Sequence, residues 1–252
     1  MDLQLKGKNA VVTGGSKGIG RAIALALAAE GANVAICARS EEPLDRALEE
    51  IQGLGVRGYR EACDVGDEDA LNRFLDNARD SLGSVDILVS NVSALGAGSD
   101  LKAWQANVNL DLMSSVRAVS KVVPWMQAAG GGNIILMSSI SGIEVGTTAP
   151  YAATKAALIS YAKSLAVELG SDNIRVNSIA PGSIEFPGGV WDKARTGNPA
   201  RYEATLKRIP HGRFGLPEEV ARVAAFLASD SAASWVTGAC IPVDGAQHRS
   251  NM

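Results

Sequence analysis

The sequence predicts an α/β fold in which a doubly wound parallel sheet forms a single domain over residues 1–252. Short apolar runs alternate with longer segments rich in Ala and Leu through most of the chain. A glycine-rich turn at residues 13–20 joins the first apolar run to the first of these longer segments. Strands and helices that alternate in this way form parallel sheets with right-handed crossovers.

The expected strands are short apolar runs bounded by glycine or polar residues. The first run leads into the glycine turn, and the second follows Gly31, which is expected to end the first helix. The fourth run is followed by the small, polar segment 90–93. In chain order the expected strands are 9–12, 33–38, 58–63, 85–89, 133–137, 174–179 and 239–243.

The expected helices are amphipathic or rich in strong helix formers. Leu44, Leu48 and Ile51 share one face of the second helix, and Asp67 is the expected N-cap of the third. Pro124 is expected to bend or interrupt the fourth helix, because proline lacks a backbone N–H. In chain order the expected helices are 21–30, 42–54, 67–82, 104–129, 151–169 and 217–229.

Residues 183–213 interrupt this alternation. Pro187, Gly197, Pro199 and Pro210 divide the segment into short helical pieces. A long irregular segment after the carboxyl end of a strand is a typical position for an active-site lid. We therefore expect a substrate lid at about 183–213 within the single domain.

The composition argues against several classes of protein. The chain is 46% hydrophobic and 20% charged, which is typical of a globular protein, and its net charge of −3 disfavours general nucleic-acid binding. No apolar run approaches the roughly 20 residues of a membrane span. The first residues lack the layout of a signal peptide. The three cysteines are far apart, so we expect no disulfide, no metal site and a cytoplasmic protein.

The glycine turn, Thr13-Gly14-Gly15-Ser16-Lys17-Gly18-Ile19-Gly20, has the layout of a phosphate-binding site. A strand, a glycine turn and a helix in that order point backbone N–H groups and a helix N-terminus at one place. Glycine permits positive φ and a close approach to a ligand. The alternative is a tight strand-to-helix turn of the kind found in many α/β proteins.

Several other segments follow strands and should meet the glycine turn in one crevice. They are Asp64, Asn91, the serines at 138 and 139, and Pro181-Gly182. In an open parallel sheet, ligands bind outside the carboxyl ends of the strands, near the point where the strand order reverses.

Tyr151 and Lys155 are four residues apart on an expected helix and therefore share a face. A free tyrosine has a pKa of about 10, but a nearby cation stabilises the phenolate and lowers that pKa. Such a phenol can donate a proton to a carbonyl oxygen or remove one from an alcohol. The alternative is an ordinary pair on the surface of a helix.

Taken together, these motifs resemble the short-chain dehydrogenase/reductase family in its compact single-domain branch, which is similar to the 3-oxoacyl reductases. The resemblance covers essentially the whole chain and implies a Rossmann-like fold and a homo-oligomer, a tetramer or dimer. The matching residues are Thr13, Gly14, Gly18, Gly20, Asp64-Val65, Asn109, Ser138-Ser139, Tyr151, Lys155, Asn177, Pro181-Gly182, 212–220 and Val243-Asp244-Gly245.

The resemblance also implies roles for individual residues. Tyr151 would be the general acid/base, and Lys155 would lower the pKa of Tyr151 and hold the nicotinamide ribose. Asn109 would anchor a water that relays protons through Lys155. A serine would bind the substrate oxygen: the strand end selects Ser139, and the spacing back from Tyr151 selects Ser138. We expect Ser139, with Ser138 as the alternative, because a strand is anchored in the sheet whereas a loop can lose one residue. The expected cofactor-binding residues are Gly14, Ser16, Lys17, Gly18, Ile19, Gly20, Arg39, Asp64, Val65, Asn91, Tyr151, Lys155, Pro181, Gly182 and Ile184.

The end of the second strand predicts NADP(H) as the cofactor. An acidic residue there would accept a hydrogen bond from the adenosine ribose and repel a 2′-phosphate. This chain has Ala38 followed by Arg39, whose planar guanidinium is suited to phosphate, and Lys17 adds a second positive charge. The alternative is that both are solvated loop cations.

Two segments depart from the family pattern. Val92 and Ser93 stand where the family commonly has Ala and Gly, and Phe186 stands near the position of a Thr that binds the carboxamide. We expect Phe186 to line the substrate pocket instead. The lid carries more basic than acidic residues, which favours an anionic substrate such as a carrier-bound acyl thioester, while Trp191 and Phe186 would equally suit an apolar ketone.

The sequence therefore predicts an NADP(H)-dependent reductase of a ketone or 3-oxoacyl group that acts on a small-molecule substrate and is reversible as an alcohol dehydrogenase. One alternative is a catalytically idle protein that binds the cofactor and reports its redox ratio to a partner. A third hypothesis is a dehydratase or epimerase that uses the same tyrosine.

Overall fold

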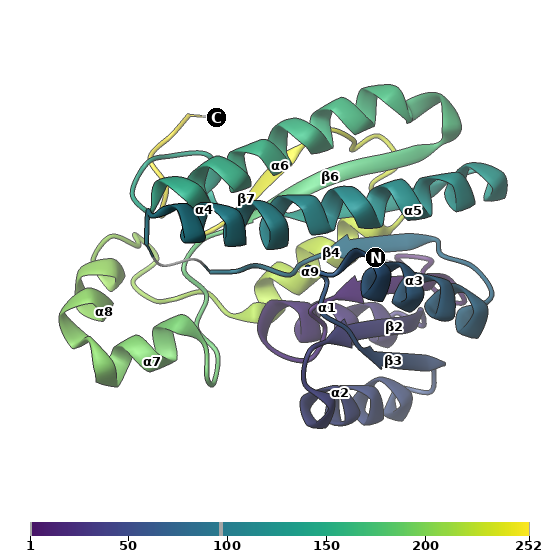
Figure 1. The fold of residues 1–252 in the computed structure, drawn as a ribbon, viewed down its shortest axis with the longest axis horizontal. Coiled ribbons are helices and arrows are strands. Elements are labelled where there is room, and N and C mark those ends of the chain that lie inside the picture. The colour runs from purple at the N-terminus through teal and green to yellow at the C-terminus, as the bar shows by residue number, and fades with distance from the viewer. Residues whose placement is uncertain (1, 96–97, 252) are drawn as a thin grey trace.

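The computed structural model describes residues 2–95 and 98–251. Within them, seven parallel strands form one sheet in the order β3-β2-β1-β4-β5-β6-β7 (Figure 1). All the expected strands are confirmed, with ends that shift by two residues or fewer. They are β1 (Asn9–Thr13), β2 (Asn33–Ala38), β3 (Gly58–Ala62), β4 (Ile87–Ser90), β5 (Gly132–Met137), β6 (Ile174–Pro181) and β7 (Cys240–Val243).

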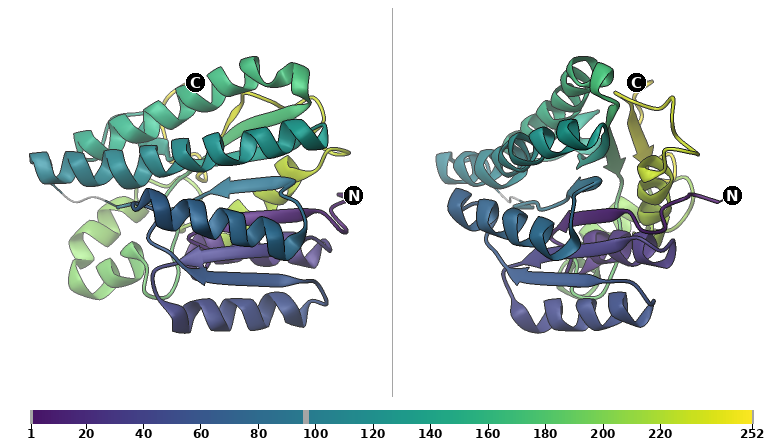
Figure 2. Two further views of the ribbon diagram at one scale, coloured as in Figure 1. Left: turned by 45° about the vertical axis from the view of Figure 1, so that its right-hand side comes forward. Right: turned by 90° about the vertical axis from the view of Figure 1, so that its right-hand side faces the viewer.

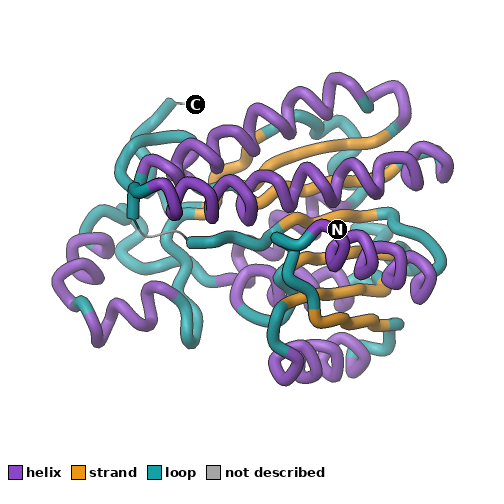
Figure 3. The backbone as a smooth tube through the Cα atoms, viewed as in Figure 1, coloured by secondary structure: helices purple, strands orange, loops and turns teal. Residues whose placement is uncertain are grey.

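Helices cover both faces of the sheet, so the doubly wound fold is confirmed (Figures 2 and 3). One face packs against α1 (Gly18–Ala29), α2 (Glu41–Gly53) and α9 (Pro217–Ala228). The other packs against α3 (Glu68–Leu82), α5 (Ser114–Ala129) and α6 (Ala149–Glu168). The chain reaches one edge of the sheet at β3 and returns as β4 beside β1. The strand order therefore reverses at β1 and β4, where such sheets bind ligands.

The expected helix 104–129 is the one element whose continuity was predicted incorrectly. The structure has α4 (Leu101–Asn107), a π-helical segment (Val108–Met113) and then α5. At the end of the π-helical segment, Ser114 N donates to Asn109 O, five residues back. Pro124 lies inside α5 without ending it, because buried Val122 and Met126 on either side anchor that helix against the sheet. The irregularity therefore lies about three turns earlier than Pro124 predicts.

The segment 183–213 carries two short helices, α7 (Val190–Gly197) and α8 (Pro199–Leu206). Figure 1 shows both helices apart from those that cover the sheet. The ring of Phe214 holds the two helices, with centroid distances of 5.1 Å to Trp191 and 4.6 Å to Tyr202. The segment is thus an ordered aromatic unit beside the carboxyl ends of the strands.

Candidate active site

The turn between β1 and α1 requires glycine. Gly14 and Gly18 have φ values of +70° and +54°, in the left-handed region. A Cβ on Gly20 would lie 2.2 Å from the carbonyl oxygen of Gly14. Lys17 occupies the N-cap of α1 without a side-chain cap, and the first turn of the helix contains no acidic residue. The first N–H groups of α1 are therefore suited to an anion, and the cradle fits the phosphates of a dinucleotide.

Asn91 braces this turn from the end of β4. Its backbone N–H donates to Thr13 Oγ1 at 3.0 Å, and its Nδ2 donates to Thr13 O at 3.2 Å. The amide also approaches Gly14 O at 3.4 Å. Asn91, predicted to bind the cofactor, thus fixes the loop after β4 to the glycine turn through its own side chain.

The residues expected beside the adenosine end of a dinucleotide follow β2 and β3. Arg39 is exposed directly after β2 and has no polar partner within the described part of the chain. Lys17 is exposed as well. After β3, Val65 is buried, whereas Asp64 is exposed and its Oδ1 accepts a hydrogen bond from Gly66 N at 2.9 Å. The two cations are therefore open to solvent near the carboxyl ends of the strands.

Tyr151 and Lys155 lie one turn apart near the start of α6. Lys155 Nζ lies 5.6 Å from the centroid of the Tyr151 ring. Tyr151 is half-buried, and the Lys155 side chain is only 2% exposed. An ordinary surface pair is thereby excluded, because a lysine at this depth costs free energy unless specific partners hold its charge.

Two groups hold the buried ammonium of Lys155. Nζ donates to the carbonyl oxygen of Met137 at 2.8 Å and forms an ion pair with Asp111 Oδ1 at 3.0 Å. Asp111 is fully buried in the π-helical segment, and its Oδ2 accepts a hydrogen bond from Ala94 N at 3.0 Å. The hydroxyl of Ser93 donates to Asp111 Oδ1. The charge of Lys155 is thus met directly by a carboxylate.

The two serines after β5 have different partners. The Ser138 hydroxyl donates to the carbonyl oxygen of Lys155 at 2.8 Å. Ser139 Oγ accepts from Ser141 N at 3.1 Å, which leaves its own hydroxyl proton available. This geometry favours Ser139 over Ser138 as a donor to a bound substrate.

Comparison with known proteins agrees with this geometry. The family model described as enoyl-(acyl carrier protein) reductase matches residues 14–248. The chain belongs to the short-chain dehydrogenase/reductase family. It is accordingly an oxidoreductase.

Three relatives show how far the likeness extends. The 3-oxoacyl-[acyl-carrier-protein] reductase FabG of Thermotoga maritima is 39% identical, over 96% of this chain and 98% of its own. L-sorbose reductase from Gluconobacter frateurii, solved with NADPH and L-sorbose, is 35% identical with a TM-score of 0.90, covering 99% of this chain and 100% of its own. A 7α-hydroxysteroid dehydrogenase, solved with NADH and 7-oxo glycochenodeoxycholic acid, is 33% identical with a TM-score of 0.90, covering 97% and 96%.

One residue assigned from the family resemblance does not lie where that role requires. Asn109 was expected to anchor a water that relays protons through Lys155, but its side chain is engaged elsewhere: Nδ2 donates to Gly66 O at 3.2 Å, and Oδ1 accepts from Arg117 Nη1 at 2.9 Å. Asp111 fills the place behind Lys155. Both residues lie in the π-helical segment, where side chains do not keep the spacing of an α-helix.

The segment that follows β6, residues 182–186, lies against the glycine turn and is called the strap below. A Cβ on Gly182 would lie 2.6 Å from Asp244 Cβ, and Ser183 N donates to Gln247 Oε1 at 2.8 Å. Pro181 and Ile184 are buried here, as a strap held to the sheet requires.

The ring of Phe186 packs on Gly18, where an added Cβ would lie 2.5 Å from Phe186 Cζ. Phe186, expected in the substrate pocket, therefore lies against the cofactor turn; Ser16 and Ile19 of that turn are partly exposed.

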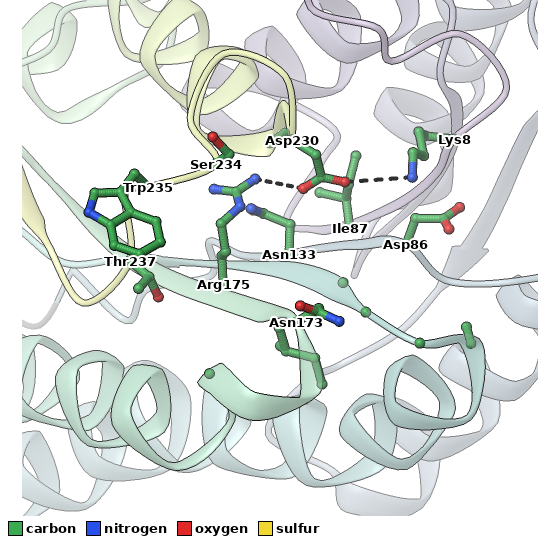
Figure 4. A pocket seen from close by; sticks show the side chains of 17 residues that line it. Lys8, Asp86, Ile87, Asn133, Asn173, Arg175, Asp230, Ser234, Trp235 and Thr237 are labelled. Carbon is green, nitrogen blue, oxygen red and sulfur yellow. Dashed lines mark hydrogen bonds and ion pairs between the residues drawn. The ribbon is translucent and has the colours of Figure 1, made fainter.

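A separate hollow of about 630 Å³ lies at the amino ends of the strands (Figure 4). Buried Arg175 donates there to Leu227 O at 2.9 Å and to Asp230 Oδ1 at 3.0 Å. Lys8 approaches the other oxygen of Asp230 at 3.7 Å. These contacts join the start of the chain to β6 and to the segment before β7. Tyr151, Lys155, Asp111 and Ser139 are not among the residues that line the hollow.

No helix in residues 2–95 and 98–251 combines the length and the hydrophobicity that crossing a bilayer demands.

Proposed function

We propose that this oxidoreductase interconverts a carbonyl group and a secondary alcohol with NADP(H), and that its substrate is a ketone or a 3-oxoacyl compound. The observation that carries the proposal is the burial of Lys155 beside the half-buried ring of Tyr151. A buried ammonium next to a phenol stabilises the phenolate, which is the form that proton transfer creates.

The residues that would hold the cofactor are those of the glycine turn, the ends of β2 and β3, and the strap after β6. The phosphates would meet the first N–H groups of α1, and the 2′-phosphate would meet Arg39 and Lys17. The sorbose reductase was solved with NADPH and the hydroxysteroid dehydrogenase with NADH, so both cofactors occur among similar proteins. Exposed Arg39, free of a carboxylate partner in the described chain, supports NADP(H).

When bound, a reduced nicotinamide supplies a hydride to the carbonyl carbon of the substrate. Tyr151 gives its phenolic proton to the carbonyl oxygen, so that the C=O group becomes a CH–OH group. The Ser139 hydroxyl donates a hydrogen bond to the same oxygen and stabilises the charge that develops on it. Lys155 stabilises the phenolate that remains, and a proton from water restores the phenol. The reverse sequence oxidises an alcohol.

The substrate would lie between Tyr151 and the segment 183–213, which we propose to be a lid. Three of the basic residues of this segment have a carboxylate partner in the described chain: Arg195 donates to Asp192 Oδ1 at 2.8 Å, Arg213 donates to Glu219 Oε1 at 2.6 Å, and Arg208 approaches Glu144 Oε1 at 3.7 Å. Paired arginines attract an anion weakly. The aromatic unit of Trp191, Tyr202 and Phe214 therefore supports an uncharged or long-chain ketone over an anionic ligand that these arginines would bind directly.

We further propose that the protein is a homo-oligomer, a tetramer or dimer, and that it works in the cytoplasm. Buried Cys37 and Cys63 support a reducing environment, because neither forms a disulfide.

The experiment that tests the proposal follows NADPH oxidation against ketones, 3-oxoacyl thioesters and sugars, with Tyr151→Phe as the decisive variant and Tyr161→Phe as its matched control. Loss of turnover in Tyr151→Phe alone supports the enzyme. Equal turnover in Tyr151→Phe and the parent would overturn the proposed chemistry, and binding of NADPH without turnover of any substrate would favour the cofactor sensor. Turnover without net consumption of NADPH would favour a dehydratase or epimerase.

A further inference from the structure

The ammonium of Lys155, which is proposed to stabilise a phenolate, is already paired with the carboxylate of Asp111. Asp111 Oδ1 lies 3.0 Å from Nζ, closer than the centroid of the Tyr151 ring at 5.6 Å. Asp111 is 0% exposed and Lys155 is 2% exposed, so water screens neither charge effectively. The pair as a whole is close to neutral, and its effect on Tyr151 is the difference between an attraction and a repulsion.

Several contacts hold the Asp111 carboxylate in place beside Lys155. Asp111 lies in the π-helical segment, and its carboxylate contacts Lys155 of α6. The Ser93 hydroxyl and Ala94 N supply its remaining hydrogen bonds. Removing a buried charge from such a pair leaves its partner uncompensated, so the arrangement is costly unless both groups are kept.

The surroundings contain few other charges. The described groups in contact with Lys155 and Asp111 come from β5, the loop after β4, the π-helical segment and α6. Tyr151, Lys155 and Asp111 are the titratable groups among them, while the Met137 carbonyl, Ser93 and Ala94 N are neutral. The carboxylate of Asp111 is therefore the one charge in direct contact with the Lys155 ammonium among the described residues.

We propose that Asp111 is a positioning residue that offsets the charge of Lys155. Tyr151 then keeps its proton to a higher pH than it would beside a Lys155 without this carboxylate, and the site is biased toward proton donation. This inference rests on the proposed function, because it assigns a direction to the same phenol. Lys155 has three N–H groups, of which Met137 O and Asp111 take two. The third remains for Tyr151 or a ligand, so Asp111 fixes where the ammonium points as well as tempering its charge.

The test titrates the Tyr151 phenol by its near-ultraviolet absorbance in the protein without cofactor, with the signal of each variant's Tyr151→Phe counterpart subtracted. The other three tyrosines interfere little: burial raises the pKa of Tyr59 to about 12 and also raises the pKa of Tyr161 and Tyr202. The variants are Asp111→Asn, Lys155→Met and the double variant, with Asp76→Asn as the matched control. Asp76 pairs with Lys121 at 2.9 Å on the surface, so the control removes a carboxylate from a lysine far from Tyr151.

We expect Asp111→Asn to lower the midpoint of the Tyr151 titration by about one unit or more, because a repelling charge is removed. Lys155→Met should raise the midpoint, the double variant should return close to the parent, and Asp76→Asn should not move it. In alcohol oxidation, Asp111→Asn should reach its half-maximal rate at correspondingly lower pH.

An unchanged or raised midpoint in Asp111→Asn would overturn the proposal. If either single variant fails to fold, the double variant decides, because it leaves no buried charge unpaired. A double variant that titrates more than about one unit above the parent would show that Lys155 acts as an untempered cation, which contradicts the offset. The titration needs no turnover, so its result is separate from the Tyr151→Phe activity test of the proposed function.

Discussion

The hydroxyl of Ser138 and the backbone carbonyl of Lys155 are joined by a hydrogen bond of 2.8 Å. This bond ties the end of β5 to α6 immediately beneath the proposed proton donor. It also commits Ser138 to a structural partner, while the neighbouring Ser139 keeps its hydroxyl proton. Two adjacent serines therefore have separable tasks.

We expect Ser139→Ala to lower kcat by about 100-fold, because one donor to the developing charge is lost, with little change in Tm. Ser138→Ala should instead destabilise the fold by about 1 kcal/mol through the lost buried hydrogen bond and retain most of kcat. Steady-state kinetics and thermal unfolding of both variants measure this. A larger kcat loss in Ser138→Ala than in Ser139→Ala would reverse the assignment.

The choice of cofactor depends on Arg39. Arg39→Asp should weaken NADPH binding by about 10-fold or more, because a charge-assisted contact worth at least 1.5 kcal/mol in typical cases becomes a repulsion. Binding of NADH should be unchanged or tighter. Arg46→Asp, at an exposed position on α2 with its own ion pair to Glu42, is the control and should leave both cofactors unaffected. Parent constants that favour NADH would contradict the prediction, whatever the variant does.

Arg175 is expected to contribute to stability and not to turnover. Arg175→Met should lower the free energy of unfolding by about 2 kcal/mol, because Asp230 loses its closer partner and buried hydrogen bonds disappear. Lys8→Met removes only the exposed 3.7 Å contact to the same carboxylate and should cost less than about 0.5 kcal/mol. Chemical denaturation gives both values, and kcat should remain that of the parent. A fall in kcat with Arg175→Met would mean that the contacts at the amino ends of the strands are coupled to the site at Tyr151.

Glu219 makes stability depend on pH at the start of α9. Hydrogen bonds from Arg213 and from Leu216 N lower the pKa of Glu219 to about 2. A lowered carboxyl pKa stabilises the folded state above the unfolded value of about 4.3, and this contribution is lost as the pH falls toward 2. Glu219→Gln should therefore reduce Tm at pH 7 by an amount worth about 1 kcal/mol or less, since the pair is partly exposed. The difference from the parent should shrink below about pH 4 and vanish near pH 2, and a difference that stays constant from pH 7 to pH 2 would refute the linkage.

The sheet and most helices could be predicted because short apolar runs bounded by glycine or polar residues alternate with longer amphipathic segments, and length and flanking residues separate the two. This pattern could not locate the π-helical segment, since a single extra residue leaves the apolar spacing of 101–129 nearly unchanged. For the same reason, position counting selected Asn109 when Asp111 meets Lys155. Ser139 was chosen over Ser138 from the position of the strand end alone, and the hydrogen bond that engages Ser138 could not be foreseen because it joins distant segments. A signal for Asp111 did exist, namely an acidic residue amid the small and apolar residues of a buried helix turn.

The contacts around Arg175 have a practical consequence. They lie at the amino ends of the strands, whereas every group proposed for proton transfer lies at the carboxyl ends. The contacts that stabilise the fold and the groups proposed for the reaction thus lie at opposite ends of the strands. Directed evolution can randomise the aromatic unit of Trp191, Tyr202 and Phe214 to accept new ketones. The contacts of Arg175 at the other end of the strands would remain and would offset part of the stability that such substitutions cost.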